Sequence, residues 1–235
     1  MAEGTPLTKV SATRNYGAEV VLTGESFQEA YEASLEHQKK SGAVYVHPFD
    51  DYDIMAGQGT MVMEMLRQED RIDTIIVPIG GGGLISGIAV AAKHVNRNIK
   101  VIGVQADGAS AMYESFRKGK LVSTSTINTI AEGIAVKTPG EKTFPIIQKY
   151  VDDILTVSDE EIASAILFML ERNKTLMEGA GAAALAALFA HNDEIDSRHL
   201  GIIVSGGNLD IGAMTKMQKL SEKLVEHESN VLMAL

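Results

Sequence analysis

Four consecutive glycines at positions 80–83 follow the apolar run at 74–79 and precede a second apolar run at 84–95. This order predicts a buried strand, a turn without side chains and the start of a helix. In such a turn successive backbone N–H groups can converge on one point, because no Cβ atom stands in the way. The helix adds its unpaired N–H groups and the positive end of its dipole. The segment therefore predicts a phosphate-binding site.

A second glycine turn, SGGN at 205–208, follows the apolar run at 200–204. Alone it is a weak signal, since many such turns only lead into a helix. The carboxyl ends of parallel strands meet at one sheet edge, so the two turns could hold opposite ends of one ligand. The alternative is a tight connection without a ligand. Four glycines in a row cost conformational entropy without any return in packing, which favours the ligand.

The surrounding chain alternates apolar strands with amphipathic helices. The predicted strands cover residues 18–22, 44–46, 74–79, 100–105, 153–157 and 200–204. The predicted helices cover residues 26–40, capped by Ser26, and 53–68, 84–95, 159–173 and 179–190, the fourth opened by the capping-box spacing of Ser158 and Glu161. The alternation predicts an α/β fold, an open and mostly parallel sheet with helices on both faces.

Composition limits the classes of function. The 235 residues are 45% hydrophobic, enough for a sizeable core, and the formal charge of −10 argues against nucleic-acid binding. The absence of cysteine excludes disulfides and thiolate chemistry, and the six histidines show no metal-ligand spacing, so we expect no metal site. No apolar stretch is long enough to span a bilayer and the N-terminus lacks a signal-peptide pattern, so we expect a cytoplasmic protein.

Other readings of the glycines are weaker. The dinucleotide fingerprint is met only loosely by residues 80–87, and the next predicted strand ends at Gln105 with Asp107 just beyond. A nicotinamide-dependent oxidoreductase therefore remains an alternative, whereas the P-loop pattern fails because no Gly-Lys-Ser/Thr follows the glycines. The adjacent carboxylates at 50–51 and 152–153 are expected to be solvated loop charges rather than acid/base pairs.

Several short segments occur in an order that carries a family resemblance: KV at 9–10, YGAEV at 16–20, AGQGT at 56–60, VPIGGGGL at 77–84, EGIA at 132–135, EGAG at 178–181 and VSGGN at 204–208. Together they resemble the threonine dehydratase and serine racemase family, fold type II enzymes that use pyridoxal 5'-phosphate (PLP). The resemblance is closest to the short catabolic threonine dehydratases and covers essentially the whole chain.

The resemblance implies a tryptophan-synthase-β-like fold, here incomplete, with residues 1–52 as the remainder of a small domain and 53–235 as the large cofactor-binding domain. It implies a homo-oligomeric lyase of amino-acid catabolism that binds PLP and converts threonine or serine to a 2-oxo acid and ammonium. The residues that it assigns to the cofactor are Gly80, Gly81, Gly82, Gly83, Leu84, Gly133, Glu178 and Ser205.

These assignments have distinct implied roles. The glycine loop and the amide of Leu84 would hold the phosphate, and Gly133 would lie beside the cofactor. Ser205 would hydrogen-bond the pyridine nitrogen, and a neutral hydroxyl does not hold that nitrogen protonated, which makes the ring a weaker electron sink. Glu178 would lie near the ring, or it could simply be an acid favoured at a helix N-terminus.

The chain departs from the family in its N-terminal part. Family members have a Schiff-base lysine in a Ser-Phe-Lys motif and an asparagine loop, Ser-Ser-Gly-Asn-His. Here SFQ at 26–28 and SFR at 115–117 lack the lysine, and the asparagine motif does not occur. We therefore expect a missing N-terminal portion, no identified catalytic residue, and little activity without that portion or a partner. A serine racemase-type enzyme and a non-catalytic phosphate- or PLP-binding module or complementing subunit remain alternatives.

Overall fold

The computed structural model describes residues 1–5, 7–25 and 27–234, so the predicted helix cap Ser26 lies outside the described residues. The chain divides into two compact units, Met1–His47 and Pro48–Leu235. The assignment of residues 1–52 to a smaller domain stays a prediction.

The first unit contains two helices, α1 (Leu7–Asn15) and α2 (Phe27–Ser41). The strands predicted at 18–22 and 44–46 are wrong, because neither segment joins a strand ladder in the described structure. The side chains of Val21 and Val44 are 57% and 87% exposed. A strand is stable only when a neighbouring strand pairs with its backbone, and the described part of this unit supplies none. Helix α1 was not predicted.

The second unit is built on a four-stranded parallel sheet in the order β3–β2–β1–β4. Its strands are β1 (Thr74–Pro78), β2 (Lys100–Ala106), β3 (Asp153–Val157) and β4 (Leu200–Ile202). Thr74 of β1 is in register with Lys100 on one side and Leu200 on the other. All five residues of β1 are buried, as an unbroken apolar run predicts for a parallel strand covered on both faces.

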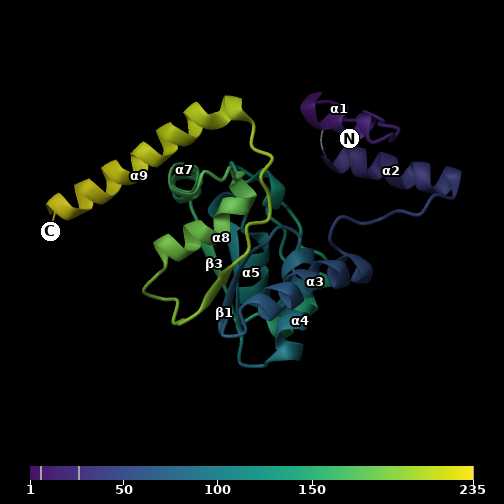
Figure 1. Cartoon of the computed structure of the whole chain (residues 1–235). Helices are drawn as coiled ribbons and strands as arrows, with labels where there is room; N and C mark the ends of the chain where they lie inside the picture. Colours follow the sequence, from purple (N-terminus) through teal and green to yellow (C-terminus); the bar gives the residue numbers. More distant parts are fainter. Residues whose placement is uncertain (6, 26, 235) are drawn as a thin grey trace. The chain divides into compact units, whose positions relative to one another are not determined.

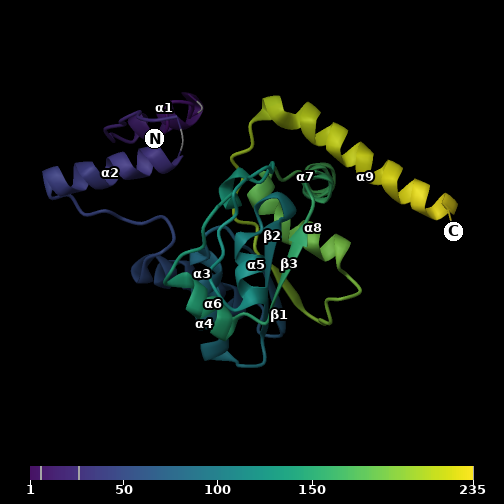
Figure 2. The ribbon, with the colours of Figure 1, turned by 180° about the vertical axis from the view of Figure 1, so that it is seen from behind.

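Helices cover both faces of this sheet (Figures 1 and 2). Ile75 and Val77 of β1 belong to the core that contains residues of α3 (Tyr52–Gln68), α4 (Gly83–Val95) and α6 (Thr143–Tyr150). Ile76 points to the opposite face and belongs to the core with α7 (Asp159–Asn173) and α8 (Gly179–Ala190). Of the remaining helices, α5 (Ala111–Lys118) contacts α6, and α9 (Met214–Ala234) packs on α7. Three 3-10 turns are also present in the described residues: η1 (Asp107–Ala109), η2 (Glu132–Ile134) and η3 (Ile211–Ala213). The predicted α/β fold with helices on both faces is confirmed.

Several helices begin where their capping residues predict. The side chain of Ser158 accepts the amide of Glu161 at 3.2 Å, and the Glu161 carboxylate accepts the amide of Ser158 at 2.7 Å, which completes the capping box of α7. At α3 the carboxylate of Asp51 accepts the amide of Asp53 at 2.9 Å. Within the described residues, no helix combines the length and the apolar character that crossing a bilayer requires.

The strand order fixes where a ligand site belongs. From β1 the chain proceeds to β2 and β3 on one side, and it returns to the other side of β1 only with β4. Open parallel sheets bind ligands outside the carboxyl ends of the strands at such a reversal of direction. The glycine turn at 80–83 follows β1 and the turn at 205–208 follows β4, so both turns lie at this point of the sheet.

Candidate functional site

A cavity of about 490 Å³ lies at the carboxyl ends of β1 and β4. Its lining includes all eight residues that the family resemblance assigns to one ligand: Gly80, Gly81, Gly82, Gly83, Leu84, Gly133, Glu178 and Ser205. The segments that supply them are far apart in the sequence, and the topology of the sheet brings them together. Their individual roles toward a ligand remain predictions.

The glycine loop has a shape that side chains would not permit. Gly82 caps α4 with a φ of 101°, in the left-handed region that favours glycine. A Cβ atom on Gly81 would overlap the ring of Phe49, and a Cβ atom on Gly83 would lie 2.8 Å from the carbonyl oxygen of Phe49. The loop therefore needs glycines both for its backbone conformation and for its close approach to Phe49.

The carbonyl oxygens and the amides of the glycine loop differ in their hydrogen bonding. The carbonyl oxygen of Gly82 accepts the amide of Ser86 at 3.0 Å, and that of Gly81 accepts the amide of Gly140 at 3.2 Å. In contrast, the amides of residues 80–84 donate no hydrogen bond to any group in the described part of the chain. Unpaired amides at a helix N-terminus are a binding site for an anion, and α4 adds the positive end of its dipole.

The cavity lining also includes Ser205, after β4, and Glu178, which precedes α8. The backbone of Glu178 donates a hydrogen bond to the carbonyl oxygen of Gly206 at 3.1 Å. A Cβ atom on Gly133 would lie 3.4 Å from Oε1 of Glu178, and one on Gly206 would overlap the same carboxylate. The Glu178 side chain therefore lies between two glycine backbones.

The lining contains no lysine, arginine or histidine within the described chain, and Glu178 is its one ionisable side chain. A bound anion would therefore meet backbone amides and a helix dipole rather than a cationic side chain. The same described residues contain no group of three histidine, aspartate or glutamate side chains that could hold a metal ion.

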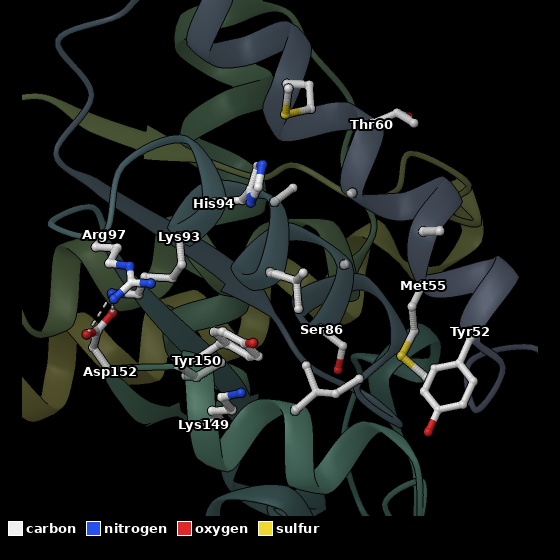
Figure 3. Close-up of a pocket in the computed structure, with 18 residues that line it drawn as sticks. Tyr52, Met55, Thr60, Ser86, Lys93, His94, Arg97, Lys149, Tyr150 and Asp152 are labelled. Atoms are coloured by element: carbon white, nitrogen blue, oxygen red, sulfur yellow. Dashed lines mark hydrogen bonds and ion pairs between the residues drawn. The ribbon is translucent and has the colours of Figure 1, made fainter.

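A larger groove of about 1180 Å³ lies elsewhere, between α3, α4 and α6 (Figure 3). It shares no lining residue with the first cavity and contains none of the predicted site residues. Its Lys93 is already paired, because Nζ lies 2.7 Å from a carboxylate oxygen of Asp152. Volume alone favours this groove, but the unpaired amides and the reversal of strand direction favour the smaller cavity as the functional site.

Sequence reasoning missed the residues that support the loop. The carboxylates at 50–51, predicted to be solvated loop charges rather than an acid/base pair, also have structural partners: Asp51 caps α3 and Asp50 accepts backbone amides at the start of α6. Asp152 also accepts the amide of Val101 at 2.7 Å. An aspartate just before an apolar-periodic run is a local signal that identifies the cap at Asp51. The partners of Asp50 are distant in sequence and leave no local pattern.

The chain is similar to several known proteins. A family model described as "Pyridoxal-phosphate dependent enzyme" matches residues 1–206. An L-threonine ammonia-lyase of Thermotoga maritima is 47% identical over 212 residues, which are 90% of this chain and 53% of that protein. A catabolic L-threonine dehydratase of Escherichia coli is 42% identical over 219 residues, 92% of this chain and 67% of that protein. The chain thus spans about half the length of the Thermotoga relative.

Solved structures share the fold as well. The processed form of threonine deaminase isoform 2 from Solanum lycopersicum matches with a TM-score of 0.89 and 37% identity, over 94% of this chain and 65% of that chain. Maize serine racemase matches with a TM-score of 0.86 and 36% identity, over 97% of this chain and 70% of that chain.

Proposed function

Because the chain belongs to the family of pyridoxal-phosphate dependent enzymes, we propose that the cavity between β1 and β4 receives PLP and that the complete protein converts threonine or serine to a 2-oxo acid and ammonium. The names of the similar proteins from Thermotoga maritima and Escherichia coli support threonine as the substrate.

The observation that carries this proposal is the run of amides at residues 80–84 that have no acceptor in the described chain. Their position at the N-terminus of α4 suits the phosphate of PLP, and the glycines leave space that Cβ atoms would fill. When bound, PLP supplies an electron sink that acidifies the Cα–H bond of an amino acid. The loop would hold the cofactor by its phosphate and so fix where the ring can lie.

Three other lining residues would orient the ring. The Ser205 hydroxyl makes no hydrogen bond within the described residues, so it is available to the pyridine nitrogen. A neutral hydroxyl leaves that nitrogen unprotonated, which restrains transamination relative to loss of the β-hydroxyl. Gly133 and the carboxylate of Glu178 would lie beside the ring, because both line the cavity and a Cβ atom on Gly133 would lie 3.4 Å from Oε1 of Glu178.

The attachment lysine is a separate part of the proposal. None of the described cavity-lining residues is a lysine, and neither Ser-Phe pair of the chain is followed by one. We therefore propose that a segment outside these 235 residues supplies the lysine that acts as base at Cα. The chain alone would bind PLP without turning over threonine.

Equilibrium dialysis with PLP, with inorganic phosphate as competitor, tests whether the glycine loop binds the phosphate. We expect PLP to bind and phosphate to displace it. Enhancement of NADH fluorescence without PLP binding would instead favour a nicotinamide-dependent oxidoreductase.

Borohydride treatment followed by mass spectrometry tests the lysine: we expect no cofactor fixed covalently to the chain in a specific position. Release of 2-oxo acid from threonine and from serine, with D-serine measured in parallel, tests the reaction once the lysine-bearing segment is present. Predominant D-serine would establish a racemase instead.

A further inference from the structure

The glycine loop is held from behind by α6. The hydroxyl of Thr143, the first residue of α6, donates a hydrogen bond of 2.7 Å to the carbonyl oxygen of Gly81. The Thr143 side chain is fully buried and lies outside the cavity lining, whereas Gly81 and Gly82 belong to that lining. Thr143 therefore acts on the loop from the side away from the cavity.

A rigid peptide plane links this contact to the cavity. In a trans peptide the carbonyl of one residue and the N–H of the next point in opposite directions. The carbonyl of Gly81 is directed to Thr143 and to the amide of Gly140, so the N–H of Gly82 is directed away from α6. A Cβ atom on Gly82 would lie 2.8 Å from the hydroxyl of Thr143, which shows how closely α6 supports the loop.

The position of Thr143 is fixed in turn by Asp50. One carboxylate oxygen of Asp50 accepts the amides of Lys142 and Thr143 at 2.9 and 3.1 Å. The other oxygen accepts the amide of Glu141 at 3.1 Å. Three amides at the start of α6 thus converge on one carboxylate, which is favoured there by the helix dipole. Asp50 also follows Phe49, whose ring packs against Gly81.

We infer that Thr143 and Asp50 are positioning residues for the phosphate of the cofactor, acting through the carbonyl of Gly81 to aim the amide of Gly82 at the cavity. This inference rests on the proposed function. It predicts that both residues affect recognition of the phosphate specifically, since neither lines the space where the rest of the cofactor would lie.

Binding of PLP and of pyridoxal, which lacks the phosphate, distinguishes positioning from packing. In Thr143→Val the shape is kept and the hydrogen bond is lost, so PLP affinity should fall about fivefold, within the range of one hydrogen bond, while pyridoxal affinity is unchanged. Thr143→Ser should restore the preference for PLP. Thr138→Val is the matched control, because its hydroxyl bonds Ser123 rather than the loop; it should leave both affinities unchanged.

Asp50→Asn provides a second variant if Thr143→Val does not fold, and it should reduce the preference for PLP in the same direction. An undiminished preference for PLP in both Asp50→Asn and any folded Thr143→Val would overturn the inference, as would an equal loss of affinity for PLP and pyridoxal. If the unsubstituted chain bound PLP no better than pyridoxal, the proposed function itself would fail and the positioning role with it.

Discussion

The amide of Glu178 donates a hydrogen bond of 3.1 Å to the carbonyl oxygen of Gly206, and this contact joins the start of α8 to the turn after β4. The contact fixes the distance between two segments that both contribute to the cavity lining. A Cβ atom on Gly181, in the first turn of α8, would overlap the same carbonyl of Gly206. This part of the cavity lining therefore depends on close backbone approach at both points.

We predict that Gly181→Ala lowers the free energy of unfolding by about 1–3 kcal/mol, the usual cost of overpacking, although alanine is otherwise favoured in a helix. It should also weaken PLP binding, because the turn that carries Ser205 must move. Urea unfolding and PLP titration measure the two effects. A variant with the stability and PLP affinity of the original chain would show that this contact is not kept in solution.

The crossing of α3 and α4 offers a matched pair of substitutions. A Cβ atom on Gly59 would lie 2.8 Å from the carbonyl oxygen of Gly87, whereas Gly57, on the exposed side of the same helix, has nothing within 4 Å of its Cβ position. We expect Gly59→Ala to destabilise the protein by about 1–3 kcal/mol and Gly57→Ala to stabilise it by about 0.5–1 kcal/mol. Denaturant unfolding of the two variants should give changes of opposite sign; changes of the same sign would contradict the observed crossing.

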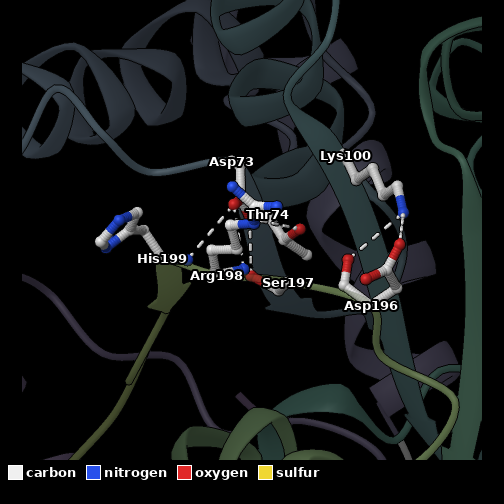
Figure 4. Close-up of polar contacts among 7 residues, drawn as sticks. All are labelled: Asp73, Thr74, Lys100, Asp196, Ser197, Arg198 and His199. Atoms are coloured by element: carbon white, nitrogen blue, oxygen red, sulfur yellow. Dashed lines mark hydrogen bonds and ion pairs between the residues drawn. The ribbon is translucent and has the colours of Figure 1, made fainter.

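Asp73 has polar contacts with residues of the segment before β4 (Figure 4). These contacts should make the stability of the protein depend on pH in the acid range. The Ser197 hydroxyl, donating at 2.6 Å, is the main cause that lowers the pKa of Asp73 to about 2; burial opposes it, and the amides of Arg198 and His199 and the Thr74 hydroxyl assist it. Because the folded pKa is lowered, the stabilisation is present above the unfolded value of about 4 and is lost as the pH falls toward 2.

Asp73→Asn should therefore cost most stability at neutral pH, and its difference from the original chain should shrink as the pH falls from about 4 to about 2. Thermal unfolding at several pH values measures this difference. Asp196→Asn is the control, since its side chain is 99% exposed and its oxygen lies 3.6 Å from Nζ of Lys100. A difference between Asp73→Asn and the original chain that is independent of pH would refute the effect.

His191 should make the stability depend on pH with the opposite sign to Asp73. Burial lowers the pKa of His191, but the hydrogen bonds to the Glu194 carboxylate at 2.8 Å and to the Thr156 carbonyl at 3.0 Å outweigh it, and the pKa is raised. A raised pKa stabilises the fold below the unfolded value of about 6.5, and this stabilisation is lost as the pH rises through the folded pKa. His191→Gln should therefore reduce stability more at pH 6 than at pH 8.5. Glu194→Gln removes the carboxylate that favours protonated His191, so it should reduce the dependence of stability on pH between these two values. Unfolding curves at both pH values check the sign.

Much of the second unit follows from local patterns. The bounds of β3 and of α8 agree with the ranges predicted from their apolar runs, and the capping box at Ser158 locates the start of α7. The glycine loop is recognisable because four glycines have few structural uses. That the glycine loop and Ser205 lie close together is predictable as well, because the carboxyl ends of parallel strands lie at the same edge of a sheet.

The remainder depends on contacts between distant parts of the chain. The runs at 18–22 and 44–46 have strand-like composition, but pairing decides whether such a segment becomes a strand, and no local pattern reveals the partner. Similarly, the amide of Thr143 meets Asp50 across 93 residues of sequence, and its hydroxyl meets Gly81 across 62. Neither contact leaves a trace in the residues that flank it.

The placement of β4 beside β1 has a consequence for biosynthesis. The glycine loop leaves the ribosome long before β4 and Ser205, so a nascent chain carries part of the cavity lining while the rest has not been translated. A ligand that needs both Gly82 and Ser205 therefore cannot be fully enclosed before Ser205 has been translated.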